Sequence, residues 1–358
     1  DYAPVVVVGH GYEEIQNHLG TNVQYAYQKK RLGTGHAVMT ARNYLEGKAG
    51  YVVVLAGDTP LITANSLREM VEFAREGNYD AVAVSAILQD PSGYGRIVRD
   101  DMLNFERIVE HKDATEKERQ IKEINASIYC FDIPSLLQGL DKLNNNNAQG
   151  EYYLTDVLGI LKNSGKRVGV YKVEDSAEIS GVNTRIELAR ADKAMRLRIN
   201  CAHMENGVTI IDPENTYISP KVEIGKDTVI YPGNMLEGET TIGERCILYP
   251  NSRIVDSKVG RYTQIQSSVI LNSEIGEETT VGPFAYIRPG SIIGNRVRIG
   301  DFVEIKNSRI GDETKISHLT YVGDGIVGRD VNLGCGVIFV NYDGEKKSTT
   351  IVEDHAFV

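Results

Sequence analysis

An apolar residue returns at nearly every sixth position over the second half of the chain, from Ile224 to Phe339. Glycine often follows it directly, as in Ile242-Gly243 and Ile293-Gly294. A six-residue repeat can supply one short strand, whose branched side chain points inward, and one tight corner, where glycine tolerates backbone conformations that other residues resist. Three such strands complete one coil, so the repeats predict a triangular parallel β-solenoid. Most of them need no chemistry, because a solenoid requires this inward ladder whatever it does.

The first half of the chain has a different pattern. Residues 5–8 and 51–55 form short continuous apolar runs, each followed by turn residues, as in buried parallel strands. Helix-like stretches such as 66–74 alternate with them, which predicts an α/β domain with a mainly parallel sheet. The stretch 184–199 has helical spacing without turn residues. We therefore expect domains at 1–183 and 207–358, joined by a linker helix at 184–206.

Composition narrows the class of protein. The 358 residues suffice for two domains, and the formal net charge of −10 disfavours nucleic acid or anionic lipid as a partner. No apolar run approaches the ~18 residues of a membrane span, and the first residues do not resemble a signal peptide, so we expect a cytoplasmic protein. The four cysteines lie too far apart in sequence for a disulfide framework or a metal knuckle, and we expect buried thiols.

Two motifs in the first half point to nucleotide chemistry. Asp58 directly follows a predicted strand, where a carboxylate commonly holds a divalent cation that bridges nucleotide phosphates. This short motif alone favours a turn or N-cap role for Asp58 over a metal ligand. The loop 28–37 contains two glycines and precedes a predicted helix, which suits close approach by a base or phosphate.

Polar residues cluster in the late repeats, at positions that a spacer does not need. Glu304 and His318 are 14 residues apart, which we take as close to one coil, so we expect them to stack. A histidine beside a carboxylate suits a general base for an amine near neutral pH. A solitary histidine on a solenoid surface is more often only solvated.

The order of motifs along the whole chain carries a specific resemblance. The motifs are Gly-Tyr-Gly-Arg-Ile at 93–97, Ile-Val-Glu-His-Lys at 108–112, Glu-Ile-Asn at 123–125, Glu-Tyr-Tyr-Leu-Thr-Asp at 151–156 and Gly-Val-Asn at 181–183. With the late repeats, they resemble the bacterial bifunctional enzymes that make UDP-N-acetylglucosamine. The resemblance implies an α/β, Rossmann-like nucleotidyltransferase domain followed by a left-handed parallel β-helix of hexapeptide repeats. It also implies a homotrimer with active sites between neighbouring subunits.

The same resemblance implies two reactions. One is the N-acetylation of glucosamine 1-phosphate by acetyl-CoA. The other is uridylyl transfer from UTP to N-acetylglucosamine 1-phosphate, with Mg²⁺ and release of pyrophosphate. The product feeds peptidoglycan and lipopolysaccharide precursors in cell-wall biogenesis.

Site residues follow from the resemblance, position by position. In the first half, the uracil contacts are Gln28, Gly33 and Thr34, the Mg²⁺ ligands are Asp58 and Asn183, and the sugar-phosphate contacts are Gly95, Glu110, Asn125 and Tyr153. In the second half, His318 deprotonates the amine and Glu304 orients its imidazole. Glucosamine 1-phosphate is bound by Arg288, Lys306, Tyr321, Asn332 and Lys347, and acetyl-CoA lies at Cys335, Asn341 and Tyr342.

Several positions depart from the family pattern. Ser317 and Cys335 replace a glycine and an alanine, and Val337 replaces a threonine. The bulkier Cys335 stands beside the expected acetyl site. The glycine-rich nucleotide loop with which the family begins is missing from the sequence, and so are the last coils. We therefore expect a segment of a longer protein that lacks both termini.

Two other functions compete with this interpretation. A sugar-1-phosphate nucleotidyltransferase could carry a β-helix that serves only oligomerisation or regulation, and a repeat scaffold could bind a partner without catalysis. Either alternative leaves Arg288, Lys306 and His318 without a purpose. The sequence therefore favours the bifunctional enzyme.

Overall fold

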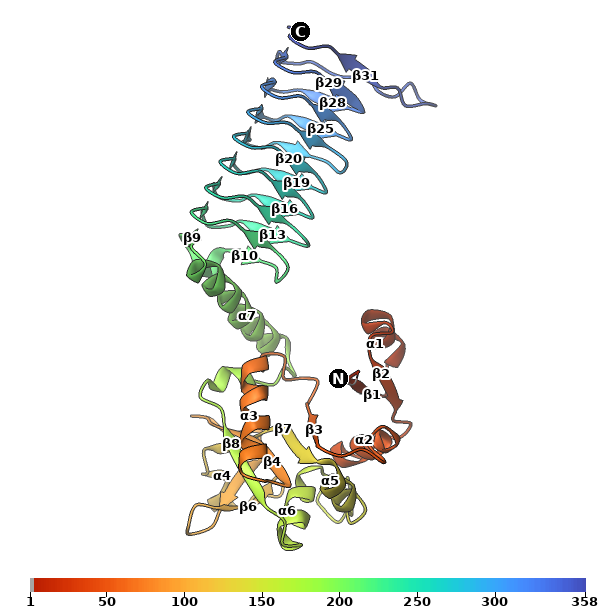
Figure 1. Cartoon of the computed structure of the whole chain (residues 1–358), viewed down its shortest axis with the longest axis vertical. Coiled ribbons are helices and arrows are strands. Elements are labelled where there is room, and N and C mark those ends of the chain that lie inside the picture. The colour runs from red at the N-terminus through yellow and green to blue at the C-terminus, as the bar shows by residue number, and fades with distance from the viewer. Residues whose placement is uncertain (1–2) are drawn as a thin grey trace. The chain divides into compact units, whose positions relative to one another are not determined.

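The computed structural model describes residues 3–358 of the chain (Figure 1). It divides into two compact units, Asp1–Ala191 and Asp192–Val358, which are described separately. Helix α7 (Arg185–Glu205) includes the point of division. Within the described residues, no helix is both long and apolar enough to cross a membrane.

The first unit alternates strands and helices. Its strands are β1 (Val5–Val8), β2 (Gln24–Tyr27), β3 (Tyr51–Val54), β4 (Ala81–Ile87), β5 (Arg96–Arg99), β6 (Phe105–Val109), β7 (Glu123–Asp132) and β8 (Val168–Lys172). Its α-helices are α1 (Tyr12–Leu19), α2 (Thr34–Thr40), α3 (Ala64–Glu76), α4 (Glu116–Arg119), α5 (Ile133–Leu140) and α6 (Thr155–Asn163), with 3-10 turns at Arg42–Tyr44 and Ser176–Ile179. This order confirms the α/β class.

The main sheet has the strand order β6-β5-β7-β4-β8, and β3 also pairs with β7. Strands β3, β4 and β8 run in the same direction, and β4 and β8 pair directly in parallel. The long strand β7 lies antiparallel between β3 and β4, and β5 and β6 add antiparallel pairs. Strands β1 and β2 form a separate parallel pair.

Helices cover both faces of this sheet. Ala81 and Ala83 of β4 face a core that includes Leu136 of α5 and Leu158 of α6. The alternate residue Val82 of β4 faces a second core with Met70 of α3. The period-two alternation of side chains along a strand divides the core in this way.

The second unit is the predicted solenoid, and its hexapeptide repeats form a left-handed parallel β-helix. One sheet contains β10 (Tyr217–Ile218), β13 (Met235–Glu237), β16 (Arg253–Val255), β19 (Val269–Leu271), β22 (Tyr286–Ile287), β25 (Glu304–Lys306) and β28 (Tyr321–Gly323). The second contains β11 (Glu223–Ile224), β14 (Thr241–Ile242), β17 (Lys258–Val259), β20 (Glu274–Ile275), β23 (Ile292–Ile293), β26 (Arg309–Ile310), β29 (Gly325–Val327) and β31 (Thr350–Val352). The third contains β9 (Thr209–Ile210), β12 (Val229–Ile230), β15 (Ile247–Leu248), β18 (Gln264–Ile265), β21 (Thr280–Val281), β24 (Arg298–Asp301), β27 (Lys315–His318) and β30 (Asn332–Leu333), and a 3-10 turn lies at Pro213–Asn215.

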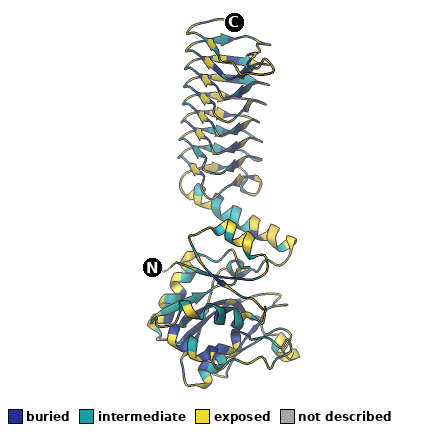
Figure 2. Cartoon of the chain, turned by 90° about the vertical axis from the view of Figure 1, so that its right-hand side faces the viewer, coloured by how far each residue is buried: buried dark blue, intermediate teal, exposed yellow. Residues whose placement is uncertain are grey.

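Most coils repeat after 16 to 18 residues, as the pairs Tyr217–Met235 and Arg253–Val269 show, and the last repeat is longer, with Gly325 in register with Thr350. The branched residues of the repeat form a continuous buried core. Figure 2 shows buried positions recurring from coil to coil along the solenoid. Ile287, Ile305 and Val322 of successive coils are fully buried in this ladder. The inward ladder expected from the sequence is therefore confirmed.

The glycines of the repeat have a different role from the expected one. Gly243 does not adopt a left-handed conformation, but a Cβ atom there would lie 2.5 Å from the backbone nitrogen of Arg261 on the next coil. Glycine is therefore needed because the coils approach closely. The left-handed corner positions are mostly occupied by other residues, and a coil has three such corners.

We name each corner after one of its left-handed residues. The Phe302 corner contains Asn251, Ser267, Phe284, Phe302 and Leu319. The Asn307 corner contains Asp256, Asn272, Asn307 and Asp324, and the Arg296 corner contains Asp227, Arg245, Tyr262, Glu278, Arg296, Glu313 and Asp330.

The expectation of four buried thiols is half wrong, because Cys130 and Cys246 are buried but Cys201 and Cys335 are exposed.

Candidate functional sites

The loop after β2 is fastened to the segment that precedes α6. The backbone nitrogen of Gly35 donates to the carbonyl of Tyr152 at 2.7 Å, and the Thr34 hydroxyl accepts from the backbone nitrogen of Leu154 at 3.0 Å. Gly33 has φ 106°, and a Cβ atom there would lie 2.6 Å from the Tyr152 carbonyl oxygen. Only glycine fits this approach. The loop with the predicted uracil contacts therefore lies against the segment that carries Tyr153.

Gln28 is held at the start of this loop. Its Nε2 lies 3.3 Å from the Gly33 carbonyl oxygen and 2.9 Å from Nδ1 of His36. His36 therefore helps to orient the Gln28 amide.

The two predicted Mg²⁺ ligands both lie near Gly181. A Cβ atom at Gly181 would be 3.6 Å from Nδ2 of Asn183 and 3.9 Å from Oδ2 of Asp58. The backbone nitrogen of Val182 donates to the Asp58 carbonyl at 2.8 Å and fixes the approach of the two loops. One carboxylate and one amide oxygen fit Mg²⁺, which usually takes few protein ligands and completes its shell with water and phosphate. Within residues 3–358, no group of three or more acidic, histidine or cysteine side chains forms a metal cluster.

Three of the predicted sugar-phosphate contacts converge. A Cβ atom at Gly95 would lie 3.4 Å from Oε2 of Glu110 and 3.6 Å from Cβ of Asn125. The Asn125 amide donates to the Tyr129 hydroxyl at 2.7 Å, and the Thr155 hydroxyl donates to Glu110 at 3.1 Å. Burial raises the pKa of the Glu110 carboxyl above its ordinary value. Because Gly95 has no side chain, its backbone can lie close to these polar groups.

Tyr153 and Tyr94 border this cluster. The Tyr153 hydroxyl accepts a hydrogen bond from Gln149 at 2.7 Å. The Tyr94 hydroxyl accepts from the backbone nitrogen of Gly181 at 3.5 Å, so the loop before β5 is connected to the loop that carries Asn183.

In the solenoid, the predicted phosphate ligands are paired with carboxylates. Arg288 lies 2.7 Å from Glu304, and Lys306 lies 3.4 Å from Asp324. Asp324 also accepts hydrogen bonds from Asn307 at 2.7 Å and from Asn341 at 2.5 Å. The hydrogen bond from Asn307 leads the effects that hold the pKa of Asp324 below its ordinary value. Asp324 therefore joins Lys306 and Asn341 in one network.

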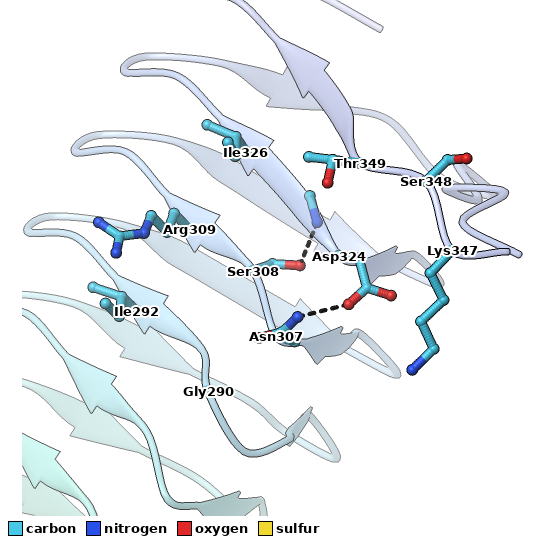
Figure 3. A pocket seen from close by; sticks show the side chains of 11 residues that line it. Gly290, Ile292, Asn307, Ser308, Arg309, Asp324, Ile326, Lys347, Ser348 and Thr349 are labelled. Carbon is cyan, nitrogen blue, oxygen red and sulfur yellow. Dashed lines mark hydrogen bonds between the residues drawn. The ribbon is translucent and has the colours of Figure 1, made fainter.

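Tyr321 and Lys347 lie near this network. A Cβ atom at Gly323 would be 2.4 Å from the Tyr321 hydroxyl and 2.6 Å from Nδ2 of Asn341, so both side chains cover Gly323. The chain then leaves the coil as a loop at 341–349, in which Tyr342 and Lys347 pair across the loop. A groove of about 490 Å³ runs beside this loop, and Lys347 extends alongside Asp324 in it (Figure 3).

The expected contact between Glu304 and His318 is wrong within this chain. Nδ1 of His318 lies 2.6 Å from Oδ1 of Asp301 instead. The coil repeat explains the error, because a residue stands beside the one 16 to 18 positions away and not 14. Glu304 lies in another sheet, in register with Tyr286 and Tyr321.

The remaining predicted residues lie nearer the C-terminal end of the solenoid. Asn332 is in β30, in register with Lys315, and Cys335 is exposed one residue before the left-handed Gly336. The Tyr342 hydroxyl donates to the Gly344 carbonyl at 2.5 Å.

The solenoid residues therefore form two groups. His318 immediately precedes Leu319 at the Phe302 corner, whereas Arg288, Lys306, Asn341 and the loop with Lys347 lie at the Asn307 corner. One face of the triangular coil, the sheet with β25 and β28, stands between the two corners.

Sequence reasoning missed residues that support the predicted ones. Asp301 contacts His318, Asp324 joins Lys306 to Asn341, and Thr155 donates to Glu110. Counting 17 residues back from His318 would have found Asp301. Thr155 belongs to the motif at 151–156, but no local pattern pairs it with Glu110.

Comparisons with known proteins agree with the division of the chain into two units. Residues 8–177 match the Nucleotidyl transferase family, and residues 272–307 match the Bacterial transferase hexapeptide (six repeats) family. "Bifunctional protein GlmU" of Acetivibrio thermocellus is 58% identical over 99% of this chain and 77% of its own length. The protein of the same name from Clostridium novyi is 56% identical over the same shares.

A solved structure also aligns with the chain, at a lower level of similarity. It is a putative glucose-1-phosphate thymidylyltransferase from Bacillus anthracis, with a TM-score of 0.41 and 18% identity over 52% of this chain and 73% of that one. The high identity to the curated relatives is sufficient without it: the chain belongs to the family of bifunctional GlmU proteins.

Proposed function

We propose that the chain is a bifunctional enzyme of UDP-N-acetylglucosamine synthesis. The solenoid transfers an acetyl group from acetyl-CoA to glucosamine 1-phosphate, and the α/β unit transfers uridylyl from UTP to N-acetylglucosamine 1-phosphate. Membership of the GlmU family carries this proposal. The product supplies cell-wall biogenesis. We extend the proposal to a cytoplasmic location and to the domain limits 1–183, 184–206 and 207–358, which the extent of α7 (Arg185–Glu205) supports.

Uridylyl transfer needs little covalent help from the protein. A phosphate oxygen of the sugar attacks the α-phosphorus of UTP, the new P–O bond forms, and the bond to pyrophosphate breaks. Positioning and charge neutralisation dominate such reactions. We assign uracil binding to Gln28, Gly33 and Thr34 and sugar-phosphate binding to Gly95, Glu110, Asn125 and Tyr153.

Asp58 and Asn183 would hold Mg²⁺ beside these groups. When bound, the ion neutralises charge that develops on the phosphate oxygens. The carboxylate of Asp58 supplies the negative charge of the site, and the backbone contact between Asp58 and Val182 keeps the two ligand loops together.

Acetyl transfer needs a base and an anion site. The amine nitrogen attacks the thioester carbonyl, the C–N bond forms, the amine proton moves to His318, and the C–S bond to coenzyme A breaks. Arg288 and Lys306 bind the sugar phosphate with fixed positive charge. Tyr321, Asn332 and Lys347 complete the sugar site, and Cys335, Asn341 and Tyr342 border acetyl-CoA.

The position of the base supports a site shared between subunits. His318 lies at the Phe302 corner, and the phosphate ligands lie at the Asn307 corner of the same coils. In a parallel homotrimer, one subunit's Phe302 corner can face the next subunit's Asn307 corner, because cyclic contacts join unlike surfaces. We propose this homotrimer, with His318 and Arg288 of each site from different subunits.

Co-expression of two inactive variants tests this arrangement. His318→Ala and Arg288→Ala lie at different corners, so random trimers should contain about a quarter of intact sites and recover that share of acetyl transfer. Arg288→Ala with Lys306→Ala serves as the control, because both changes lie at one corner and no intact site can form. Recovery in neither mixture, from variants shown to form mixed trimers, would place the whole site within one chain.

The alternative of a non-catalytic β-helix makes a different prediction. It expects no acetylation of glucosamine 1-phosphate by acetyl-CoA, in the wild type or in any variant. Activity in the wild type and its loss in His318→Ala would exclude that alternative, whereas equal activity in both would refute His318 as the base.

A further inference from the structure

Two strands of the third solenoid sheet are longer than the others. Strands β24 (Arg298–Asp301) and β27 (Lys315–His318) each have four residues, whereas the other described strands of that sheet have two. The extension carries the pairing to the end of the strands, where Asp301 stands in register with His318.

The backbone fixes this register closely. A Cβ atom at Gly300 would lie 1.9 Å from the Ser317 carbonyl oxygen, so the two coils can approach here only because residue 300 is glycine. The backbone nitrogen of Leu319 donates to the Asp301 carbonyl at 3.0 Å. Phe302 and Leu319 then both turn in the left-handed region. Asp301 and His318 are therefore equivalent residues of adjacent coils, each directly before the same corner.

The side chains meet through one nitrogen of the ring. Oδ1 of Asp301 lies 2.6 Å from Nδ1 of His318, and within residues 3–358 no hydrogen bond engages Nε2. A carboxylate accepts a hydrogen bond but cannot donate one, so a neutral imidazole in this contact carries its proton on Nδ1. The lone pair of Nε2 is then available to an incoming amine.

Stability does not account for this contact. The side chains of His318 and Asp301 are 61% and 38% exposed, and exposed ion pairs contribute little to folding. Glu304 does not compete for the ring within the chain, because it pairs with Arg288 at 2.7 Å in a different sheet.

We propose that Asp301 is a positioning residue for acetyl transfer: it holds His318 in the tautomer whose Nε2 accepts the amine proton. The inference rests on the proposed role of His318 as base. The amine proton moves to Nε2 as the C–N bond forms, and the ring returns a proton to the departing thiolate of coenzyme A. Asp301 remains a carboxylate throughout and supports the imidazolium between the two transfers.

Asp301→Asn in the full-length protein tests the proposal. An asparagine amide can donate to Nδ1 and so favour the tautomer with the proton on Nε2, which cannot act as base. We expect kcat for acetyl transfer to fall on the order of 100-fold with KM nearly unchanged. Nitrogen-15 NMR of the labelled histidines should show the Nε2–H form of His318 increasing. Asp301→Ala should lose the tautomer preference and fall less far in kcat.

A second histidine pair provides a matched control. His355 Nδ1 lies 3.1 Å from Oδ2 of Asp330 at the Arg296 corner, with similar exposure. Asp330→Asn should alter the His355 signals and leave kcat at the wild-type value.

The outcomes separate this inference from the proposed function. Wild-type kcat in Asp301→Asn, with activity lost in His318→Ala, would overturn the role of Asp301 and leave the base in place. Loss of kcat without any change of the His318 tautomer would make Asp301 merely structural and would also overturn it. Full activity in His318→Ala would refute the proposed base itself.

Discussion

The two units of the chain place their functional residues by different rules. Over most of the solenoid, a residue stands beside the one 16 to 18 positions away, so Asp301 meets His318 and Lys306 is in register with Gly323. In the α/β unit, the contacts that form the site join distant segments, and Thr34 and Leu154 are 120 residues apart. Counting along the sequence can locate neighbours in the solenoid, but only the folded structure reveals them in the α/β unit.

The same difference determines how far from a substitution the structure should lose stability. Each solenoid coil contacts only its neighbours, so stability is the sum of local terms. The α/β sheet is held by two cores that draw on strands and helices from across the unit.

Ile305→Ala should have the largest effect. Ile305 is fully buried between Ile287 and Val322, and removing a buried isoleucine side chain costs about 3 kcal/mol. Hydrogen exchange followed by mass spectrometry should show lost protection in the coils on either side, with the α/β unit unchanged. Leu158→Ala is the control, and it should reduce protection throughout the α/β unit. Equal loss in both units after Ile305→Ala would refute local cooperativity.

Gly33→Ala should weaken nucleotide-sugar binding in the α/β unit. The added Cβ atom would meet the Tyr152 carbonyl at 2.6 Å in a left-handed backbone, a strain of about 2 kcal/mol. We expect calorimetry to show UDP-N-acetylglucosamine affinity falling by more than tenfold. Gly11→Ala is the matched control, because Gly11 is also left-handed but has open space around it. Equal losses in the two variants would mean that backbone strain alone, and not the loop contact, matters.

Asp324→Asn should reduce acetyl transfer without unfolding the coil. It removes the charge that holds Lys306 and orients Asn341, so kcat/KM for glucosamine 1-phosphate should fall about tenfold, or ~1.4 kcal/mol. Asp256→Asn, at the same corner but away from the predicted ligands, should have no such effect. Steady-state kinetics of both variants would measure the difference. An unchanged kcat/KM in Asp324→Asn would show that the network does not contribute to acetyl transfer.

Glu110→Gln should stabilise the α/β unit at neutral pH. Burial raises the folded-state pKa of Glu110, so its charged form opposes folding, and wild-type stability falls as the pH rises through that pKa. Glutamine can still accept from Thr155 and stays neutral, so the variant should gain on the order of 1 kcal/mol at pH 7. Urea unfolding at acidic and neutral pH measures this gain, which should vanish at low pH. A gain that does not depend on pH would point to packing instead.

The sequence anticipated the fold better than the site geometry. The six-residue period determines the three sheets of the solenoid, because each apolar position needs the same inward place. The period did not show that the close approach of the coils requires glycine at Gly243 and equivalent positions. Steric contact between coils leaves no local signal in the sequence. The pairing of His318 was assigned to Glu304 because the coil length was misjudged by three residues.

In the α/β unit, the predicted residues came from resemblance and not from spacing. Asp58 alone looked like a turn residue, and only the folded chain brings it beside Asn183 around Gly181. The contacts of Thr155 and Tyr152 were not anticipated, because their partners, Glu110 and Gly33, lie far away in the sequence. Nonlocal contacts of this kind depend on strand order, which the sequence pattern did not specify.

We conclude that two independent sites, one in each unit, catalyse the two reactions. Assays of each half-reaction on His318→Ala and on Asp58→Ala test this conclusion. We predict that His318→Ala loses acetylation of glucosamine 1-phosphate but still converts supplied N-acetylglucosamine 1-phosphate and UTP. We predict the reverse for Asp58→Ala. Loss of both activities in either correctly folded variant would contradict the assignment of one reaction to each unit.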